Sequence, residues 1–347
     1  MKNYILTEDN GRENHAGSKA RNDIEKIVLN QKYIPVTIRK YKLDGPLSRV
    51  QQVGVVFADW MRLLKMLDKG SCLLLQIPVT YGKMYVPFYL KLIKKLKNLR
   101  IIMLIHDLDA IRELEKNEQR EINFLKIADF IICHNDKMKQ VLINKSINSR
   151  SLFSLGIFDY IAESSLKKNR RSLSSQVIIA GNLMPGKAQY IYKLQAVKGD
   201  TIFNLYGPNY ESDTQVSTIK YHGQFGPEEL LDKLQGSFGL VWDGDEIETC
   251  SGFMGAYLKV NNPHKTSLYL AAGIPVIVWS QSAMAEFVLK ENIGITVESL
   301  NDISEAIKKI GEHDYQVMVK NASGVSKKLR NGFYTATVLA KALSSKQ

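Results

Sequence analysis

The sequence has few cysteines and no long apolar run, and both absences narrow the class of protein. Its 347 residues include three cysteines, Cys72, Cys133 and Cys250, each in or beside an apolar run. Three cysteines cannot form a disulfide framework, so we expect reduced, buried thiols in a cytoplasmic protein. No segment reaches the roughly 20 apolar residues of a membrane-spanning helix. The apolar start of the chain is also too short for a signal peptide.

Proline and glycine are infrequent, with 9 and 23 residues, whereas 45% of the residues are apolar and 24% are charged. These proportions are typical of a globular protein and exclude extensive disorder. At about 150 residues per domain, the length indicates two domains.

Acidic residues are outnumbered, and the formal net charge is +12. This charge is compatible with a nucleic acid, an anionic membrane or an anionic substrate. The basic residues form no stripe with interleaved stacking aromatics, so we expect no nucleic-acid partner. The densest run, 91–97, has helical apolar spacing. It is either a solvated helix face or a peripheral contact with the membrane.

Short apolar runs alternate with helical periods in both halves of the chain. Strands are predicted at 4–6, 36–39, 72–77, 101–105 and 130–133, then at 177–180, 202–206, 238–242, 276–279 and 295–297. Unbroken apolar strands between helices indicate parallel sheets covered on both faces. We therefore predict an α/β fold with two doubly wound domains.

The polar segment 162–172 interrupts this alternation and is predicted to be the linker. The domains are then 1–160 and 170–331. Helices are predicted at 18–29, 55–67, 85–96, 111–127, 187–197, 227–235, 265–272, 282–290 and 302–310, with two more in 314–343. The last of these, within 332–347, is expected to cross back to the first domain.

Ligands of doubly wound sheets bind at the carboxyl ends of the strands, so the loops there are the candidate sites. The first such loop leads through Gly17 into a predicted helix that carries Lys19 and Arg21. Backbone N–H groups at a helix start can bind an anion, which makes this a candidate phosphate or acceptor loop. The spacing is not that of a dinucleotide fingerprint, and a plain surface loop is the alternative.

A second candidate follows the strand at 101–105, where His106, Asp107 and Asp109 come in succession. A histidine or a carboxylate there can act as a general base or bind a hydroxyl, although one aspartate can instead cap the next helix. Metal binding is not expected, because His106 has no further histidine or cysteine at ligand spacing.

The second domain has three candidate loops. Gly181 and Asn182 follow one strand, and Asp243 and Asp245 follow another. Lys265, Thr266 and Ser267 open a helix, where hydroxyls, an ammonium and backbone N–H groups favour a diphosphate. The alternatives are a plain turn at the first loop and an acidic turn at the second.

Several of these strings resemble a known group of enzymes. Gly273-Ile-Pro-Val resembles the nucleotide-sugar half of GT-B glycosyltransferases. The strings at 16–21, 105–109 and 242–252, with Asn-Asn-Pro-His-Lys-Thr-Ser at 261–267, resemble bacterial β-1,6-galactofuranosyltransferases. The same group includes the glucosyltransferases that extend GlcNAc on serine-rich-repeat adhesins. The resemblance covers nearly the whole chain and implies two Rossmann-like domains that face a central cleft.

The resemblance implies a UDP-sugar donor in the second domain and an acceptor in the first, with no cofactor or obligatory metal. It assigns the donor to Gly181, Asn182, Lys265 and Thr266. Many GT-B enzymes bind the ribose through a glutamate at the position of Leu268, so here Asn182, Tyr206 or the Asp243 loop would replace it.

The β product of the group implies inversion and a base, for which Asp107 is the first choice, followed by Glu8 and His15. The acceptor would be a lipid-linked or capsular glycan, or a GlcNAc-modified adhesin, and a homo-oligomer is expected. A glycan-binding partner without turnover is the alternative.

Overall fold

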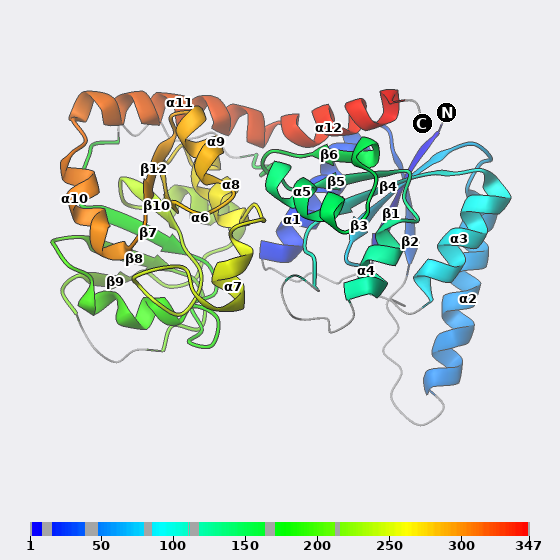
Figure 1. The fold of residues 1–347 in the computed structure, drawn as a ribbon, viewed down its shortest axis with the longest axis horizontal. Coiled ribbons are helices and arrows are strands. Elements are labelled where there is room, and N and C mark those ends of the chain that lie inside the picture. Colours follow the sequence, from blue (N-terminus) through cyan, green and yellow to red (C-terminus); the bar gives the residue numbers. More distant parts are fainter. Residues whose placement is uncertain are drawn as a thin grey trace. The chain divides into compact units, whose positions relative to one another are not determined.

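The computed structural model describes residues 2–8, 16–38, 48–79, 85–109, 111, 118–163, 171–211 and 216–345 (Figure 1). The chain divides into two compact units. Unit 1 contains Met1–Leu155 and Thr335–Gln347, and unit 2 contains Gly156–Tyr334.

Unit 1 is built on a six-stranded sheet of order β2-β1-β3-β4-β5-β6. All of its strand pairs are parallel. The strands are β1 (Asn3–Glu8), β2 (Ile34–Ile38), β3 (Cys72–Ile77), β4 (Arg100–Ile105), β5 (Phe130–Cys133) and β6 (Leu152–Ser154). The helices are α1 (Ala16–Asn30), α2 (Ser48–Met66), α3 (Val86–Lys97), α4 (Glu118–Leu125), α5 (Asp136–Asn144) and the short η1 (Ser149–Ser151), while α12 (Phe333–Ser344) ends the chain. Every residue of β3 is buried, as expected for a central parallel strand.

Unit 2 repeats this architecture with the order β12-β11-β10-β7-β8-β9, again wholly parallel. Its strands are β7 (Gln176–Ala180), β8 (Ile202–Tyr206), β9 (Ile219–Tyr221), β10 (Phe238–Val241), β11 (Val276–Trp279) and β12 (Gly294–Val297). Its α-helices are α6 (Pro227–Lys233), α7 (Gly252–Tyr257), α8 (His264–Ala271), α9 (Ala285–Lys290), α10 (Ile303–Lys308) and α11 (Glu312–Arg330), and its 3₁₀-helices are η2 (Gln189–Ala196) and η3 (Leu300–Asp302). The two parallel sheets confirm the predicted α/β fold class.

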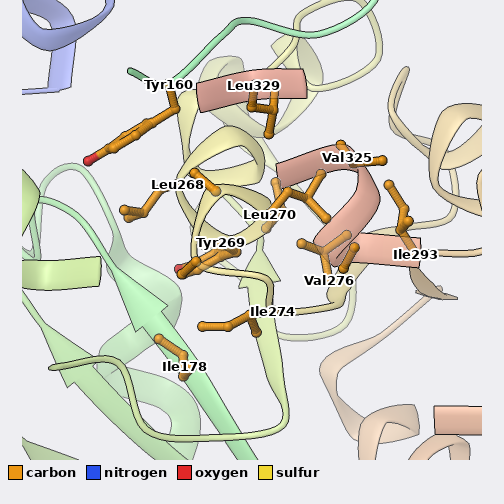
Figure 2. Close-up of a cluster of buried hydrophobic side chains, with 14 of the residues drawn as sticks. Tyr160, Ile178, Leu268, Tyr269, Leu270, Ile274, Val276, Ile293, Val325 and Leu329 are labelled. Atoms are coloured by element: carbon orange, nitrogen blue, oxygen red, sulfur yellow. The ribbon is translucent and has the colours of Figure 1, made fainter. Parts of the chain in front are cut away.

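The core of unit 2 fixes the position of α8. Figure 2 shows Leu268, Tyr269 and Leu270 of this helix in one apolar cluster with Val325 and Leu329 of α11. Gly239 in β10 leaves room for the Tyr269 ring, because a Cβ there would lie 2.1 Å from it. The Tyr269 hydroxyl accepts a hydrogen bond of 2.7 Å from the backbone N–H of Ala180. Through Tyr269, α8 is therefore tied to the carboxyl end of β7.

The division between the two units falls between Leu155 and Gly156, a few residues before the end of the predicted first domain at residue 160. Phe158, Asp159 and Tyr160 are each at most 4% exposed and belong to unit 2, where Tyr160 is part of the core cluster. These three residues precede the predicted linker at 162–172, and Arg171 within that segment donates to two carbonyls of unit 2. Residues 164–170 lie outside the described part of the chain.

Short elements account for the other differences. The predicted helix at 187–197 is the 3₁₀-helix η2, whose buried positions fit either helix type. Of the predicted helix at 111–127, the structure has α4, with 112–117 outside the described residues. None of the described helices combines the length and apolar composition of a membrane span.

Candidate functional site

In unit 2, an ion pair lies where the carboxyl end of β10 meets the first turn of α8. The Lys265 Nζ donates to Asp243 Oδ1 at 2.7 Å and to the Trp242 carbonyl at 3.0 Å. Burial lowers the pKa of Lys265, but the charge and hydrogen bond of Asp243 outweigh it, and the net shift of the pKa is upward. Lys265 is therefore a fixed cation at this edge of the sheet.

Gly181 follows β7 and lies beside this cation. Its φ is +144°, and a Cβ there would come within 3.4 Å of Lys265 Cε. The carbonyl of Gly181 lies against Gly207, where a Cβ would be only 1.8 Å away. Glycine at both positions thus allows two loops to meet next to the Lys265 side chain. The structure brings together three of the predicted donor residues, Gly181, Asp243 and Lys265.

The two hydroxyls that follow Lys265 point inward. Ser267 is 1% exposed, and its Oγ donates to the Phe158 carbonyl at 2.6 Å. This arrangement does not support a donor contact for Ser267, because its hydroxyl anchors the 158 segment instead. The Thr266 Oγ is buried without a hydrogen-bond partner among the described residues. A buried hydroxyl of this kind carries an unmet cost of desolvation.

Tyr206, which was predicted as a possible ribose contact, is instead buried and hydrogen-bonded within unit 2. It is 1% exposed, its hydroxyl donates to the Lys233 carbonyl at 3.2 Å, and its ring stacks on His222. The hydroxyl is therefore both a donor and an acceptor, since the same oxygen accepts a hydrogen bond from the Gln235 N–H. Asn182 is half-buried, and its Oδ1 accepts from the N–H of Met184 at 3.1 Å. It shapes the loop after β7.

The two aspartates of the loop after β10 lie in different surroundings. Asp243 is paired with Lys265, whereas Asp245 is exposed. Among the described residues, no group of three His, Cys, Asp or Glu side chains could hold a metal ion. Leu268, at the position where a ribose-binding glutamate would be expected, lies in the core at 8% exposure.

In unit 1, a second group forms at the carboxyl ends of β1, β3 and β4. We call Glu8, Arg21, Glu25, Gln76 and His106 the carboxyl-edge cluster. Arg21 donates to the carbonyls of Gln76 and Pro78, and its guanidinium lies 3.6 Å from Glu8 Oε2. His106 Nε2 lies 2.7 Å from Gln76 Oε1. Three predicted residues, Glu8, Arg21 and His106, therefore come together around Gln76.

Neither Gln76 nor Glu25 was named as a site residue from the sequence, and Glu25 is the ionisable one of the two. It lies one turn after Arg21 on α1, and its Oε1 is 3.4 Å from Gln76 Nε2. Burial raises the pKa of Glu25 to about 7, Arg21 opposes that rise, and Glu8 adds to it. The i, i+4 spacing from Arg21 is the sequence signal that could have drawn attention to it.

The burial of Arg21 lowers its pKa, against the charges of Glu8, Asp107, Glu25 and Asp109. Asp107 thus lies within electrostatic reach of the cluster. Burial outweighs the attraction of this guanidinium at Glu25, so Glu25 holds its proton close to neutral pH.

The remaining predicted residues of unit 1 are placed as follows. Lys19 forms an ion pair with the buried Asp23 one turn later in α1. The charge of Lys19 is therefore balanced within unit 1. Gly17 lies in the first turn of α1, which begins at Ala16, two residues before the predicted start. His15 lies outside the described residues. Three residues were predicted for the phosphate or acceptor loop, namely Gly17, Lys19 and Arg21. Of these, Arg21 belongs to the carboxyl-edge cluster.

Comparison with known proteins decides the family. The family model "Glucosyltransferase 3-like, N-terminal domain" matches residues 2–157. The model of the C-terminal domain of the same family matches residues 177–342. The chain belongs to the glucosyltransferase 3-like family. This assignment confirms the resemblance found in the sequence and makes the chain a glycosyltransferase.

Curated relatives of this family member span most of its length. Beta-1,6-galactofuranosyltransferase WbbI of Escherichia coli K12 is 34% identical over 343 residues, which is 97% of each chain. Glucosyltransferase 3 of Streptococcus gordonii is 25% identical over 79% of each chain. Glucosyltransferase 3 of Streptococcus parasanguinis is 27% identical over 73% of each chain.

Solved structures identify the fold of the family member. The apo lipopolysaccharide outer core galactosyltransferase WaaB has a TM-score of 0.63 at 12% identity, over 100% of both chains. An α,α-trehalose-phosphate synthase from Burkholderia vietnamiensis has a TM-score of 0.63 at 11% identity, over 99% of this chain and 100% of that one. At these identities the likeness establishes the GT-B fold alone.

Proposed function

We propose that this glycosyltransferase moves a hexosyl group, first of all galactofuranose, from a UDP-sugar to a sugar hydroxyl in the assembly of a cell-surface polysaccharide or glycoprotein. The choice of sugar is supported by the relatives, because the galactofuranosyltransferase shares 34% identity over 97% of the chain. The glucosyltransferase 3 sequences share 25% and 27% over shorter stretches.

The observation that carries the donor site is the fixed cation of unit 2. Lys265 stands at the amino end of α8, next to Gly181, and its side chain keeps 22% exposure beside Asp243 at 17%. A helix start and an ammonium attract the same anion, here the diphosphate of the donor. We propose that Lys265 stabilises the UDP leaving group, so that neither a cofactor nor an obligatory metal takes part.

The reaction we propose is an inverting displacement at the anomeric carbon. The acceptor hydroxyl attacks that carbon, the bond to the UDP oxygen breaks, and a base takes the hydroxyl proton. Asp107 remains our first choice of base, followed by Glu8 and His15. Support for a base in this region is that Glu8 lies in the carboxyl-edge cluster and that Asp107 lies within electrostatic reach of its guanidinium.

The test uses the purified full chain with UDP-galactofuranose, UDP-glucose and UDP-GlcNAc, each with EDTA present. We expect release of UDP with UDP-galactofuranose and a β-linked product by NMR. Lys265→Met should reduce kcat at least about a hundredfold, since it removes charge stabilisation of the leaving group. The matched control is Lys290→Met, which changes an exposed lysine of α9. Turnover only after magnesium or manganese is restored would contradict the metal independence.

A second candidate is transfer of glucose or GlcNAc onto a GlcNAc-modified adhesin. It is favoured by the family models, which match both halves of the chain and carry the glucosyltransferase 3 description. Turnover with UDP-glucose or UDP-GlcNAc alone would select it. If no UDP-sugar binds, the chain is the non-catalytic glycan-binding partner instead.

A further inference from the structure

A stripe of large apolar side chains is exposed on α3. Phe88 is 66% exposed, and Leu92 and Leu96 follow it at 38% and 54%. These positions are spaced four residues apart, so they line one side of the helix. The opposite side, with Val86, Leu90 and Ile93, is buried. The exposed stripe is therefore separate from the buried side of α3, which packs against the rest of unit 1.

An aromatic contact continues the stripe onto α2, which lies beside α3 at one edge of unit 1 (Figure 1). The Tyr89 ring lies 5.3 Å from that of Phe88 and 6.4 Å from that of Phe57, which is 51% exposed. Tyr89 also stacks on the buried Trp60. The two exposed phenylalanines therefore both lie next to Tyr89, which is itself stacked on the buried Trp60.

The exposed charged side chains along the stripe on α3 are positive. Lys91 and Lys95 are exposed and lie between the apolar positions of the stripe, and the sequence of α3 has no acidic residue. Next to the carboxyl end of α3 is a hollow of about 630 Å³, whose lining includes Lys91, Lys95 and Arg100. Its one acidic lining residue, Asp129, is paired with Lys94 at 2.8 Å.

We propose that the face formed by Phe57, Phe88, Lys91, Leu92, Lys95 and Leu96 binds an anionic lipid bilayer. Apolar side chains at helical spacing enter the boundary between headgroups and acyl chains, and lysines beside them attract lipid phosphates. A second copy of the chain fits this face less well, because a symmetric contact would bring the lysines of α3 against each other. This inference does not depend on the proposed sugar or mechanism.

The experiment is flotation of the full chain with vesicles of phosphatidylcholine alone and of phosphatidylcholine mixed with phosphatidylglycerol. We expect binding to the mixed vesicles that weakens with added salt. Lys91→Gln with Lys95→Gln should weaken it about 30-fold, at roughly fivefold per lysine. Phe88→Ser with Leu92→Ser should weaken it by at least about a hundredfold, since each loses the burial of a large apolar side chain.

Matched controls come from unit 2, where Leu289→Ser removes a side chain that is 57% exposed and Lys290→Gln removes an exposed lysine. Both should leave vesicle binding unchanged. Phe88→Trp adds a local readout, because its fluorescence should shift to the blue and be quenched by brominated lipids.

Three results would overturn the proposal. They are no binding to mixed vesicles, equal binding of the wild type and the stripe variants, or equal binding to neutral vesicles. If Phe88→Ser with Leu92→Ser instead turns an oligomer into a monomer and vesicles are not bound, a second copy covers this face.

Discussion

Replacement of Glu25 by glutamine should stabilise the folded protein, and more strongly at higher pH. Glu25 is held between α1 and β3, with its Oε1 3.4 Å from Gln76 Nε2 and the Glu8 carboxylate nearby. Glutamine has nearly the same shape and keeps the acceptor oxygen for Gln76. The substitution therefore removes the ionisation of the side chain while it preserves the packing.

The size of the effect follows from the pKa. Burial raises the pKa of Glu25 from 4.5 to about 7, which corresponds to roughly 3 kcal/mol against the ionised form. Because the side chain keeps part of its exposure, solvent screening reduces this to about 1–2 kcal/mol. Between these two pKa values the folded state holds a proton that the unfolded state has lost. The wild type therefore loses this stability as the pH rises from about 4.5 to about 7, whereas the variant does not.

The measurement is urea unfolding of the wild type and Glu25→Gln between about pH 5 and about pH 8. The free energy of unfolding of the variant should exceed that of the wild type by about 1–2 kcal/mol at the upper end and by little at the lower end. Hydrogen exchange of the β3 amides at high pH should show the gain in unit 1.

The control for this comparison is Glu229→Gln, which changes an exposed carboxylate of α6. Its difference from the wild type should stay small across the range. A difference for Glu25→Gln that does not vary with pH, or that has the opposite sign, would refute the reasoning about burial of its charge.

Three further predictions concern unit 2. Gly181→Ala should weaken UDP-sugar binding about tenfold or more in calorimetry, because alanine is strained at a φ of +144° and its Cβ meets Lys265; unchanged affinity would remove Gly181 from the site. Ser267→Ala should lower the free energy of unfolding by about 1 kcal/mol and leave KM for the donor unchanged, because the lost hydrogen bond goes to Phe158. A large rise in KM would restore Ser267 as a donor ligand. Gly239→Ala should cost about 3 kcal/mol or more in urea unfolding, because its Cβ would overlap the Tyr269 ring, and a stability close to that of the wild type would contradict this packing.

Apolar periodicity was sufficient for the central strands. The run Cys72–Ile77 was predicted with the bounds it has in the structure, because a strand buried on both faces is apolar along nearly its whole length. The three-residue strands β6 and β9 at the sheet edges were missed. The residues of β9 are partly or fully exposed, so its sequence carries no continuous apolar signal.

The order of strands and helices along the chain was enough to locate the loops of the candidate sites. The carboxyl ends of parallel strands share one edge of a sheet, so Gly181, Asp243 and Lys265 could be grouped from their places after strands or at a helix start. Which side chains form hydrogen bonds within the fold depends on tertiary packing. Ser267 and Tyr206 face inward because α8 and β8 pack that way, and spacing along the chain does not show the partner. The pKa of Glu25 is likewise tertiary, since desolvation by residues distant in the sequence produces it.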